Sequence, residues 1–181
     1  MKIISDASAS QRQRGAALVV ALIMLLVMTV LGIAAMQVTR MEERMAGNSR
    51  DVNLAFQSAE AGLRDAEGRI FSGPKPMPTC AAAPCAVWDK DHLLPADLRN
   101  QTLSWWSTYG VEYGVAATAE IPEVTRDPIV TTEHLWFEPD SLAPSNGKKV
   151  GRDFYKVTAN ATGASDSANV VLESTYTQRR D

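Results

Sequence analysis

Hydrophobic residues are concentrated in one uninterrupted stretch near the N-terminus. No Asp, Glu, Lys or Arg occurs from Ala16 to Thr39. A helix of about 20 apolar residues, rising about 1.5 Å per residue, crosses the roughly 30 Å hydrocarbon core of a bilayer. The pattern therefore predicts a membrane-spanning helix over residues 16–39.

The hydrophobic pattern becomes a one-sided helical stripe beyond Gln37. Gly73 with Pro74 predicts the end of this helix, and Gly47 with Asn48 is the best candidate for a bend. We therefore expect an amphipathic helix over residues 40–71 and a globular head over residues 72–181. Its apolar residues recur at spacings of three, four or seven, as one helix face requires: Met41, Met45, Val52, Phe56, Ala59, Leu63, Ala66 and Ile70.

Alternation with a period of two predicts strands in the second half of the chain. Residues 111–121 alternate apolar with polar or small side chains, and residues 129–138 are β-branched and aromatic. Residues 154–161 and 168–176 predict a hairpin whose loop is longer than two residues. A sheet of three or four strands with one apolar face needs a cover, which the helical stripe supplies. The predicted fold class is α+β, with one long N-terminal helix packed against a small antiparallel sheet.

Charge and motifs argue against several classes of function. The net charge of −3 over 181 residues provides no positive field for a nucleic acid backbone. No GxSxG, HExxH or glycine-rich phosphate loop is present, so we expect neither an enzyme nor a cofactor. His92 and His134 are the only histidines, which leaves a zinc site short of ligands. Asp89–His92 lacks the glycine and distal glutamate of an EF-hand loop and predicts a solvated turn.

Basic residues before the apolar stretch predict its orientation. Lys2, Arg12 and Arg14 place the N-terminus in the cytoplasm by the positive-inside rule, so the head lies on the far side of the membrane. An ordinary single-pass anchor would account for the hydropathy alone. A cleaved secretory signal is a weaker alternative, because its apolar region is usually only about 7–15 residues long.

The junction at Gly15 narrows these alternatives. A short basic leader that ends at Gly15 and runs directly into an apolar helix resembles the signal of type IV pilins and pseudopilins. The following segment, "EERMAGNSRDVNLAFQSAEAGLRDAE" (residues 42–67), is similar to the N-terminal signature of PilX-type minor pilins. The resemblance is close over residues 12–70 and looser over residues 152–178.

This resemblance implies a pilin fold and a specific maturation. A prepilin peptidase would remove the cytoplasmic leader, residues 1–15, by cutting after Gly15, and would methylate the new N-terminal residue, Ala16. Residues 16–39 would be retained as the transmembrane and filament-core half of the helix. The implied function is that of a minor pilin that primes type IV pilus assembly and supports twitching motility and adhesion. The implied partners are other minor pilins, the major pilin, the peptidase, the inner membrane and, as a further candidate, a large tip adhesin.

One residue departs from the pilin pattern. Most pilin subunits carry a glutamate at the fifth mature position, which is Val20 here. An unpaired carboxylate in hydrocarbon costs several kcal/mol, so a subunit with no neighbour above it is better served by an apolar residue. Val20 therefore favours a position at the fibre tip. A minor pseudopilin of a type II secretion system shares this lack and is the nearest alternative.

The head contains two further candidate features. Cys80 and Cys85 lie in a Pro-rich segment, and an oxidising compartment predicts a disulfide between them. Their four intervening residues do not form a C-x-x-C redox motif. Trp105 and Trp106 are adjacent and suggest either core packing or an exposed adhesive patch. The patch would suit a third alternative, a membrane-tethered periplasmic module that binds a glycan or a peptide.

Overall fold

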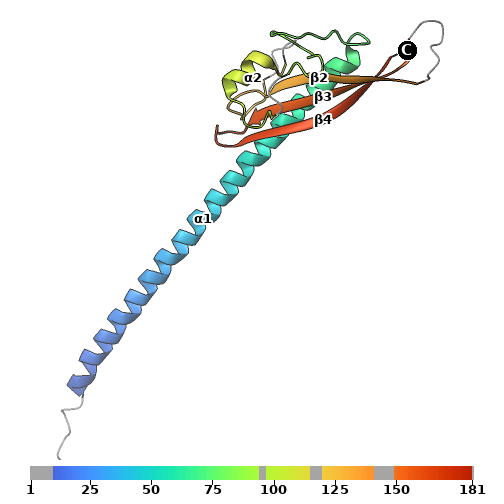
Figure 1. Cartoon of the computed structure of the whole chain (residues 1–181). Coiled ribbons are helices and arrows are strands. Elements are labelled where there is room, and N and C mark those ends of the chain that lie inside the picture. The colour runs from blue at the N-terminus through green and yellow to red at the C-terminus, as the bar shows by residue number, and fades with distance from the viewer. Residues whose placement is uncertain (1–9, 94–96, 115–119, 141–148, 181) are drawn as a thin grey trace, which may run out of the picture. The chain divides into compact units, whose positions relative to one another are not determined.

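A computed structural model describes residues 10–93, 97–114, 120–140 and 149–180. The chain forms two compact units, residues 1–47 and 48–181, and helix α1 (Ser10–Ser72) contributes to both. The second unit pairs the C-terminal part of α1 with an antiparallel sheet (Figure 1), which confirms the α+β, pilin-like fold.

Helix α1 ends where the sequence predicts, but it is not interrupted at the expected bend. Its last residue is Ser72, directly before Gly73 and Pro74. Helical structure continues through Gly47 and Asn48. Sharp kinks usually need a proline, a Gly/Ser pair, a π-bulge or an inserted group, and here Gly47 and Asn48 lie within an unbroken run of helical residues. Glycine alone therefore does not break this helix.

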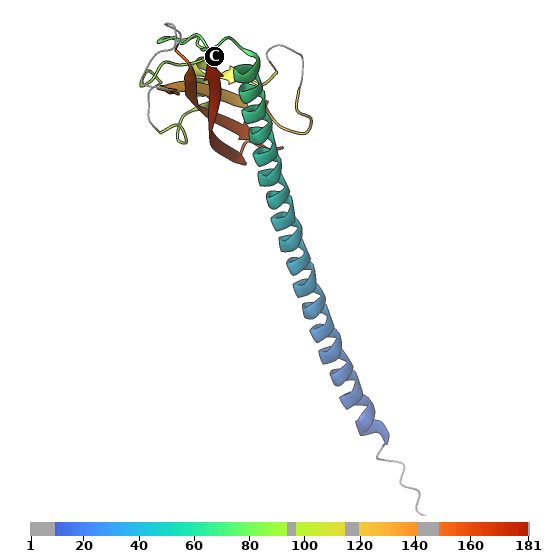
Figure 2. The ribbon, with the colours of Figure 1, turned by 90° about the vertical axis from the view of Figure 1, so that its right-hand side faces the viewer.

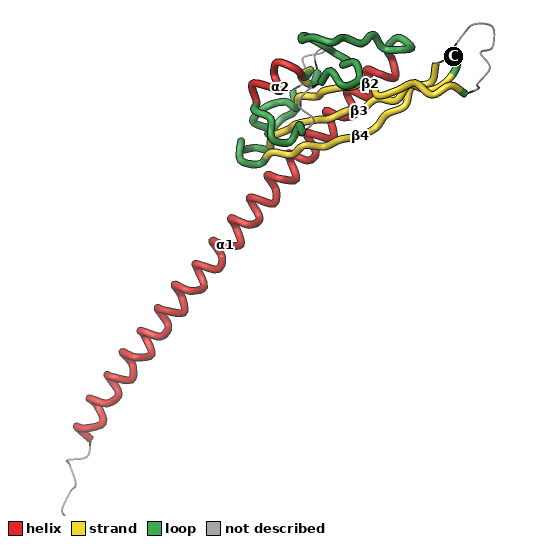
Figure 3. Tube along the Cα trace, viewed as in Figure 1, coloured by secondary structure: helices red, strands yellow, loops and turns green. Residues whose placement is uncertain are grey.

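The sheet has four strands in the order β1-β2-β3-β4, with antiparallel pairing between neighbours. Figure 3 shows β2, β3 and β4 side by side. Strands β3 and β4 pair along their whole length, and the loop of residues 163–168 joins them. The register of β2 with β3 shifts between His134 and Trp136. The predicted long-loop hairpin is confirmed. The strands are β1 (Val111–Glu112), β2 (Ile129–Pro139), β3 (Gly151–Thr162) and β4 (Asn169–Arg180).

The strand predicted over residues 111–121 is confirmed only at Val111 and Glu112, which pair with β2. Tyr113 and Gly114 form a turn, in which Gly114 adopts a φ of 73°, in the left-handed region that glycine tolerates best. Residues 115–119 lie outside the described residues, and Ile121 is in a loop.

One face of the sheet packs on α1. The C-terminal half of the helical stripe meets inward-facing residues of β2 and β3, and half-buried residues of β4 border the cluster. Figure 2 shows α1 lying along this face of the sheet. The buried members are Ala59, Leu63, Ala66, Ile70, Val87, Val130, Tyr155, Val157, Ala159 and Ala161.

The opposite face of the sheet carries a second core that the sequence analysis did not predict. Helix α2 (Leu103–Tyr109) and the segment around the cysteines cover Ile129 and Val171 there. Trp106 is buried and Trp105 is half-buried, so the tryptophan pair packs mainly as core, within a short helix rather than a loop. The other buried members are Cys85, Trp88, Leu93 and Leu98.

Candidate functional site

The predicted processing junction is exposed. Gly15 and Ala16 both lie in α1 with solvent-exposed surfaces. A Cβ built on Gly15 would have no other atom within 4 Å, apart from its immediate chain neighbours and the helix's own backbone. Residues 1–9 of the predicted leader lie outside the described residues. The junction is therefore unobstructed by the described part of the chain.

The apolar half of α1 exposes its hydrophobic side chains on every side. Val20 is 56% exposed, Leu25 67% and Met28 71%. Within the described residues, α1 is the one helix long and apolar enough to cross a membrane, with a mean hydropathy of 2.9 over its best window. Such a surface is stable only in lipid or among other apolar helices.

The polar side chains of this segment are also suited to an apolar medium. The hydroxyl of Thr29 donates to the carbonyl of Leu26 at 2.8 Å, and the hydroxyl of Thr39 donates to that of Ala35 at 3.3 Å. Each hydroxyl is satisfied within its own helix, which removes the cost of an unpaired polar group in hydrocarbon.

In the head, an acidic residue of α1 holds the β3–β4 loop. The backbone N–H of Ser165 donates to Oδ1 of Asp51 at 3.2 Å, and the Ser165 hydroxyl donates to Oδ2. Gly163 passes so close to Asp51 that an added Cβ would collide with its carbonyl and carboxylate oxygens. These contacts fix the loop against the helix at the end of the sheet.

The loop contact should depend on pH. The Ser165 side-chain hydrogen bond is the main reason that the pKa of Asp51 lies below its ordinary value of 3.8. Because the folded pKa is lowered, the contact stabilises the loop above about pH 4 and is lost as the pH falls through the folded pKa. We expect backbone hydrogen exchange at residues 163–168, corrected for intrinsic rates, to accelerate under acid. The Asp51→Ala variant should exchange quickly both at pH 7 and under acid.

Glu60→Ala is the matched control for this measurement, since it removes an exposed carboxylate from the same helix. It should leave exchange in the loop unchanged. Equal protection of the loop in Asp51→Ala and the unsubstituted protein at pH 7 would contradict the assignment.

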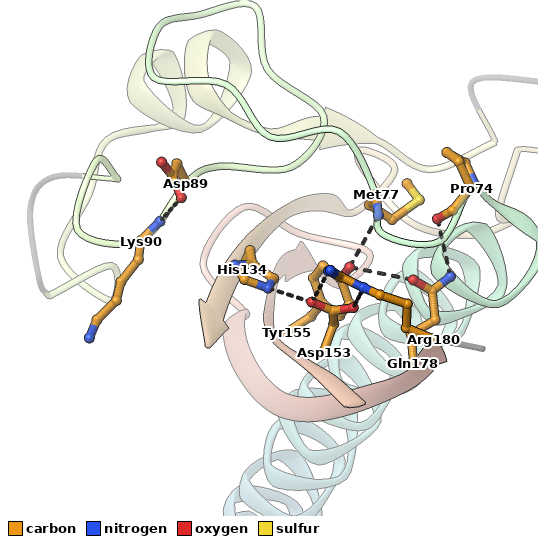
Figure 4. A network of polar contacts seen from close by, with 9 residues as sticks. All are labelled: Pro74, Met77, Asp89, Lys90, His134, Asp153, Tyr155, Gln178 and Arg180. Atoms are coloured by element: carbon orange, nitrogen blue, oxygen red, sulfur yellow. Dashed lines mark hydrogen bonds and ion pairs between the residues drawn. The ribbon is translucent and has the colours of Figure 1, made fainter. Parts of the chain in front are cut away.

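A buried ionic network joins three strands beside the α1 core (Figure 4). Asp153 of β3 has an exposed fraction of 0%. Arg180 of β4 donates to it twice, from Nε at 2.9 Å and from a terminal nitrogen at 2.6 Å. His134 of β2 lies 3.0 Å from the same carboxylate, and the Arg180 guanidinium stacks 4.5 Å from the ring centroid of Phe137. The network fastens the C-terminal strand to the sheet.

A second set of hydrogen bonds continues from this network to the end of α1. The side-chain amide of Gln178 donates to the carbonyls of Ile70 and Pro74. Its carbonyl accepts from the Tyr155 hydroxyl at 3.4 Å, and that hydroxyl accepts from the backbone N–H of Met77 at 3.2 Å. Burial is the main cause that raises the pKa of Tyr155 above its usual value. These contacts secure the point where the chain leaves the helix.

The predicted disulfide is present and is linked to the sheet. Cys80 and Cys85 are bonded, with their Cα atoms 5.9 Å apart. Cys80 also forms backbone hydrogen bonds with Val87 and Asp89. Trp88, between them, donates its backbone N–H to Thr132 at 2.8 Å and accepts from His134 at 2.8 Å. The disulfide therefore stabilises a segment that extends one edge of the sheet.

The other carboxylate, histidine and hydroxyl side chains of the described residues do not converge on a single site. Among the residues that the structure describes, no group of three or more His, Cys, Asp and Glu side chains is placed to hold a metal ion. The Asp89–His92 stretch forms a turn in which Asp91 has a φ of 62° and donates its backbone N–H to Glu133. A hollow of about 430 Å³ beside α2 is lined by Ser104, Ser107, Glu112 and Arg126, among others. Arg126 is already paired there with Asp166 at 2.8 Å.

Comparisons with protein-family models cover most of the chain. The model described as PilX N-terminal matches residues 14–64, and the model described as type IV pilus assembly protein PilX C-term matches residues 49–178. Comparisons with curated proteins and with solved structures give no match. The two family matches overlap over residues 49–64 of α1, and together they include the junction at Gly15, strands β1 to β3 and all but the last two residues of β4. The chain therefore belongs to the PilX family of type IV pilus assembly proteins.

Proposed function

We propose that this protein is a non-catalytic minor pilin that helps to prime assembly of type IV pili and is incorporated at or near the fibre tip. The observation that carries the proposal is the uncharged half of α1, which is exposed at every residue from 16 to 39 and continues into the part of the helix that packs in the core of the head. In a PilX-family chain, this surface suits a subunit that is first held in lipid and then buried among similar helices.

The proposed mechanism assigns a role to each part of the chain. Residues 1–15 are a cytoplasmic leader, removed after Gly15, and Ala16 is then methylated. Residues 16–39 anchor the protein in the inner membrane and later pack in the filament, while residues 40–71 carry the periplasmic head of residues 72–181. Extraction from the bilayer replaces lipid contacts with helix contacts of similar apolarity, so the transfer costs little free energy. The head then contacts other minor pilins and the major pilin, supporting twitching motility and adhesion.

Val20 supports a position at the tip. Its side chain is 56% exposed in an entirely apolar neighbourhood. A glutamate there would cost several kcal/mol without a cationic partner, and the first subunit of a fibre has no neighbour above it to supply one. The first subunit to leave the membrane is therefore the one for which valine is the more favourable residue.

Sequencing of the mature N-terminus tests the proposed processing. In wild-type cells we expect the purified protein to begin at N-methylated Ala16, and in cells that lack the prepilin peptidase it should begin at Met1. An unprocessed Met1 form in both strains would contradict the proposal, as would a protein that begins beyond Met36.

The deletion phenotype distinguishes a pilin from a pseudopilin. Loss of surface pili with intact exoprotein secretion is expected, and the head should be detected by immunogold labelling at fibre ends. The opposite phenotype, normal pili with failed secretion, would assign the protein to type II secretion. Replacement of residues 1–39 by an unrelated anchor should abolish function, whereas a tethered binding module would tolerate it.

A further inference from the structure

The two edges of the sheet differ in how they are covered. The outer edge of β2 is paired with β1 at Val130 and with Trp88 at Thr132 and His134. At the opposite edge, β4 (Asn169–Arg180) is the last strand, and within the described residues no backbone group pairs with its outer side. Figure 1 shows β4 as the outermost of the long strands.

The register identifies the backbone groups that point outward from β4. The Gly163 N–H donates to the Ala168 carbonyl at 2.9 Å, which marks residues 163 and 168 as a hydrogen-bonded pair. Such pairs recur at every second position of an antiparallel ladder. Even-numbered residues of β4 therefore bond to β3, whereas odd-numbered residues direct their N–H and C=O groups away from the sheet. They include Asn169, Val171, Glu173, Thr175 and Thr177.

Strand β4 carries only some of the features that usually protect an open edge. Proline, charged side chains, bulges and short length are the common protections. The 12 residues of β4 contain no proline or lysine and their register with β3 is unbroken, whereas Glu173, Arg179 and the inward-facing Arg180 are charged. Thr175 and Thr177 are neighbouring members of the outward set and have high strand propensity. The edge is thus a long, regular template for another strand.

The sheet face beside this edge adds side-chain specificity. Thr177 is paired with Phe154, and Phe154 stacks on Trp136 with ring centroids 4.8 Å apart. Trp136 remains 48% exposed. A strand added next to β4 would place a side chain opposite Thr177, where it would extend this aromatic row. An apolar or aromatic residue fits that position best, because cross-strand pairs of this kind stabilise a sheet.

We propose that the free edge of β4 binds an extended segment of another pilus subunit, which adds a fifth strand to the sheet. An open edge recognises backbone, so its complement is a segment in extended conformation. A second copy of this chain is the competing occupant. Antiparallel pairing of β4 with itself would need a two-fold axis normal to the sheet, so the α1 segments packed on the two sheets would run in opposite directions. The crosslinking below identifies that arrangement as an adduct between copies of this chain. The identity of the partner rests on the proposed function.

Site-specific photo-crosslinking in the native bacterium tests the proposal on the full-length protein. A benzophenone amino acid at Thr175 or Thr177 is expected to give an adduct with another pilus subunit, with the linked peptide in an extended segment of that subunit. The same probe at Lys90, in an exposed turn away from β4, is the control and should give none of this adduct. Absence of an adduct at both edge positions would overturn the proposal, and so would an adduct only between copies of this chain.

A backbone substitution provides the second measurement. Thr175→Pro removes one outward N–H and leaves the β3 hydrogen bonds in place, as edge prolines generally do. With the benzophenone at Thr177, it should lower the adduct yield about fivefold, which corresponds to the loss of one backbone hydrogen bond of about 1 kcal/mol. Thr175→Ala keeps the N–H and should match the unsubstituted chain. Unchanged yield in Thr175→Pro would contradict the proposed pairing.

Failure of this inference can be distinguished from failure of the proposed function. If deletion of the gene abolishes piliation but no edge adduct forms, the function stands and the edge proposal is wrong. If deletion leaves piliation intact but the adduct forms, the edge binds a partner and the priming role is wrong.

Discussion

Replacement of Arg180 by alanine is expected to lower the free energy of unfolding of the head by about 3–5 kcal/mol. The substitution removes both Arg180 hydrogen bonds to Asp153, whose side chain has no solvent-exposed surface. His134 is then the only remaining side chain near the carboxylate in the described network. A buried charge that loses its main partner keeps its desolvation cost without the compensating attraction, which is why the effect is large.

Denaturant unfolding of the full-length protein in detergent, followed by tryptophan fluorescence, measures this effect. Arg64→Ala is the matched control, because Arg64 forms an exposed pair with Glu60 that contributes only about 0.3–0.5 kcal/mol. The double variant Asp153→Leu with Arg180→Met should recover much of the loss, since it removes both charges together. A loss in Arg180→Ala no greater than that in Arg64→Ala would refute the assigned role of the network.

The network also affects the proposed binding edge. Arg180 is the last residue of β4, and its bonds to Asp153 hold that end of the strand on β3. An edge strand binds an extended partner well only when it is already ordered, because ordering during binding consumes part of the interaction free energy. Arg180→Ala should therefore also lower the adduct yield at Thr177, although neither Arg180 nor Asp153 would contact the partner.

The elements with strong periodicity could be predicted from the sequence. The apolar run, the helical stripe and the alternation in β3 each extend over many residues, so α1 and the β3–β4 hairpin appear where they were expected. The stripe was predicted to pack as core with its upper half left free, and its C-terminal part is the buried portion. Met45 remains 62% exposed and Phe56 45% exposed, although Ala55, the residue before Phe56, is fully buried.

The buried network was missed although its positions carried a signal. Asp153 has the same parity along its strand as Tyr155 and Val157, so alternation alone places it on the helix-facing side of the sheet. Arg180 likewise has the parity of Tyr176 on β4. Two opposite charges predicted to be inward on neighbouring strands indicate a buried pair. The contacts from His134 and from the end of α1 depend on register and could not be deduced in this way.

The second core was missed for a different reason. Its cover is built from short segments with no periodicity, namely the disulfide-linked stretch and the seven residues of α2. Trp88 contacts the edge of β2 through an isolated β-bridge to Glu133. Such a contact depends on the path of the whole segment between α1 and the sheet, not on a local sequence pattern. Strand β4 also packs on both faces, because Val170 borders the α1 core and Val171 borders the second core. A strand covered on both faces lacks the regular alternation of apolar and polar residues that would reveal its second packed face. Local patterns cannot show such long-range covering.

Replacement of Trp106 by alanine is expected to destabilise the head by about 3–5 kcal/mol, the usual cost of removing a fully buried tryptophan. Trp106 is 1% exposed and packs edge-on against Trp105, with ring centroids 5.3 Å apart. Its indole N–H has no hydrogen-bond partner among the described residues. Trp106→Phe should therefore cost much less, because it keeps most of the ring volume and removes an unpaired buried donor.

Trp105→Ala is the control that separates packing from ligand binding. Trp105 is half-buried and stacks on Tyr109 at a centroid distance of 5.0 Å, so its loss should cost less stability than Trp106→Ala. The order is measured by the denaturant midpoints of Trp106→Ala, Trp106→Phe and Trp105→Ala, which report stability directly if the three variants share the same m-value. If Trp105→Ala proved the more destabilising, the burial assigned to α2 would be wrong. If Trp105→Ala kept full stability but abolished piliation, the exposed face of Trp105 would be a contact in the assembled fibre, and the tryptophan pair would combine core packing with recognition.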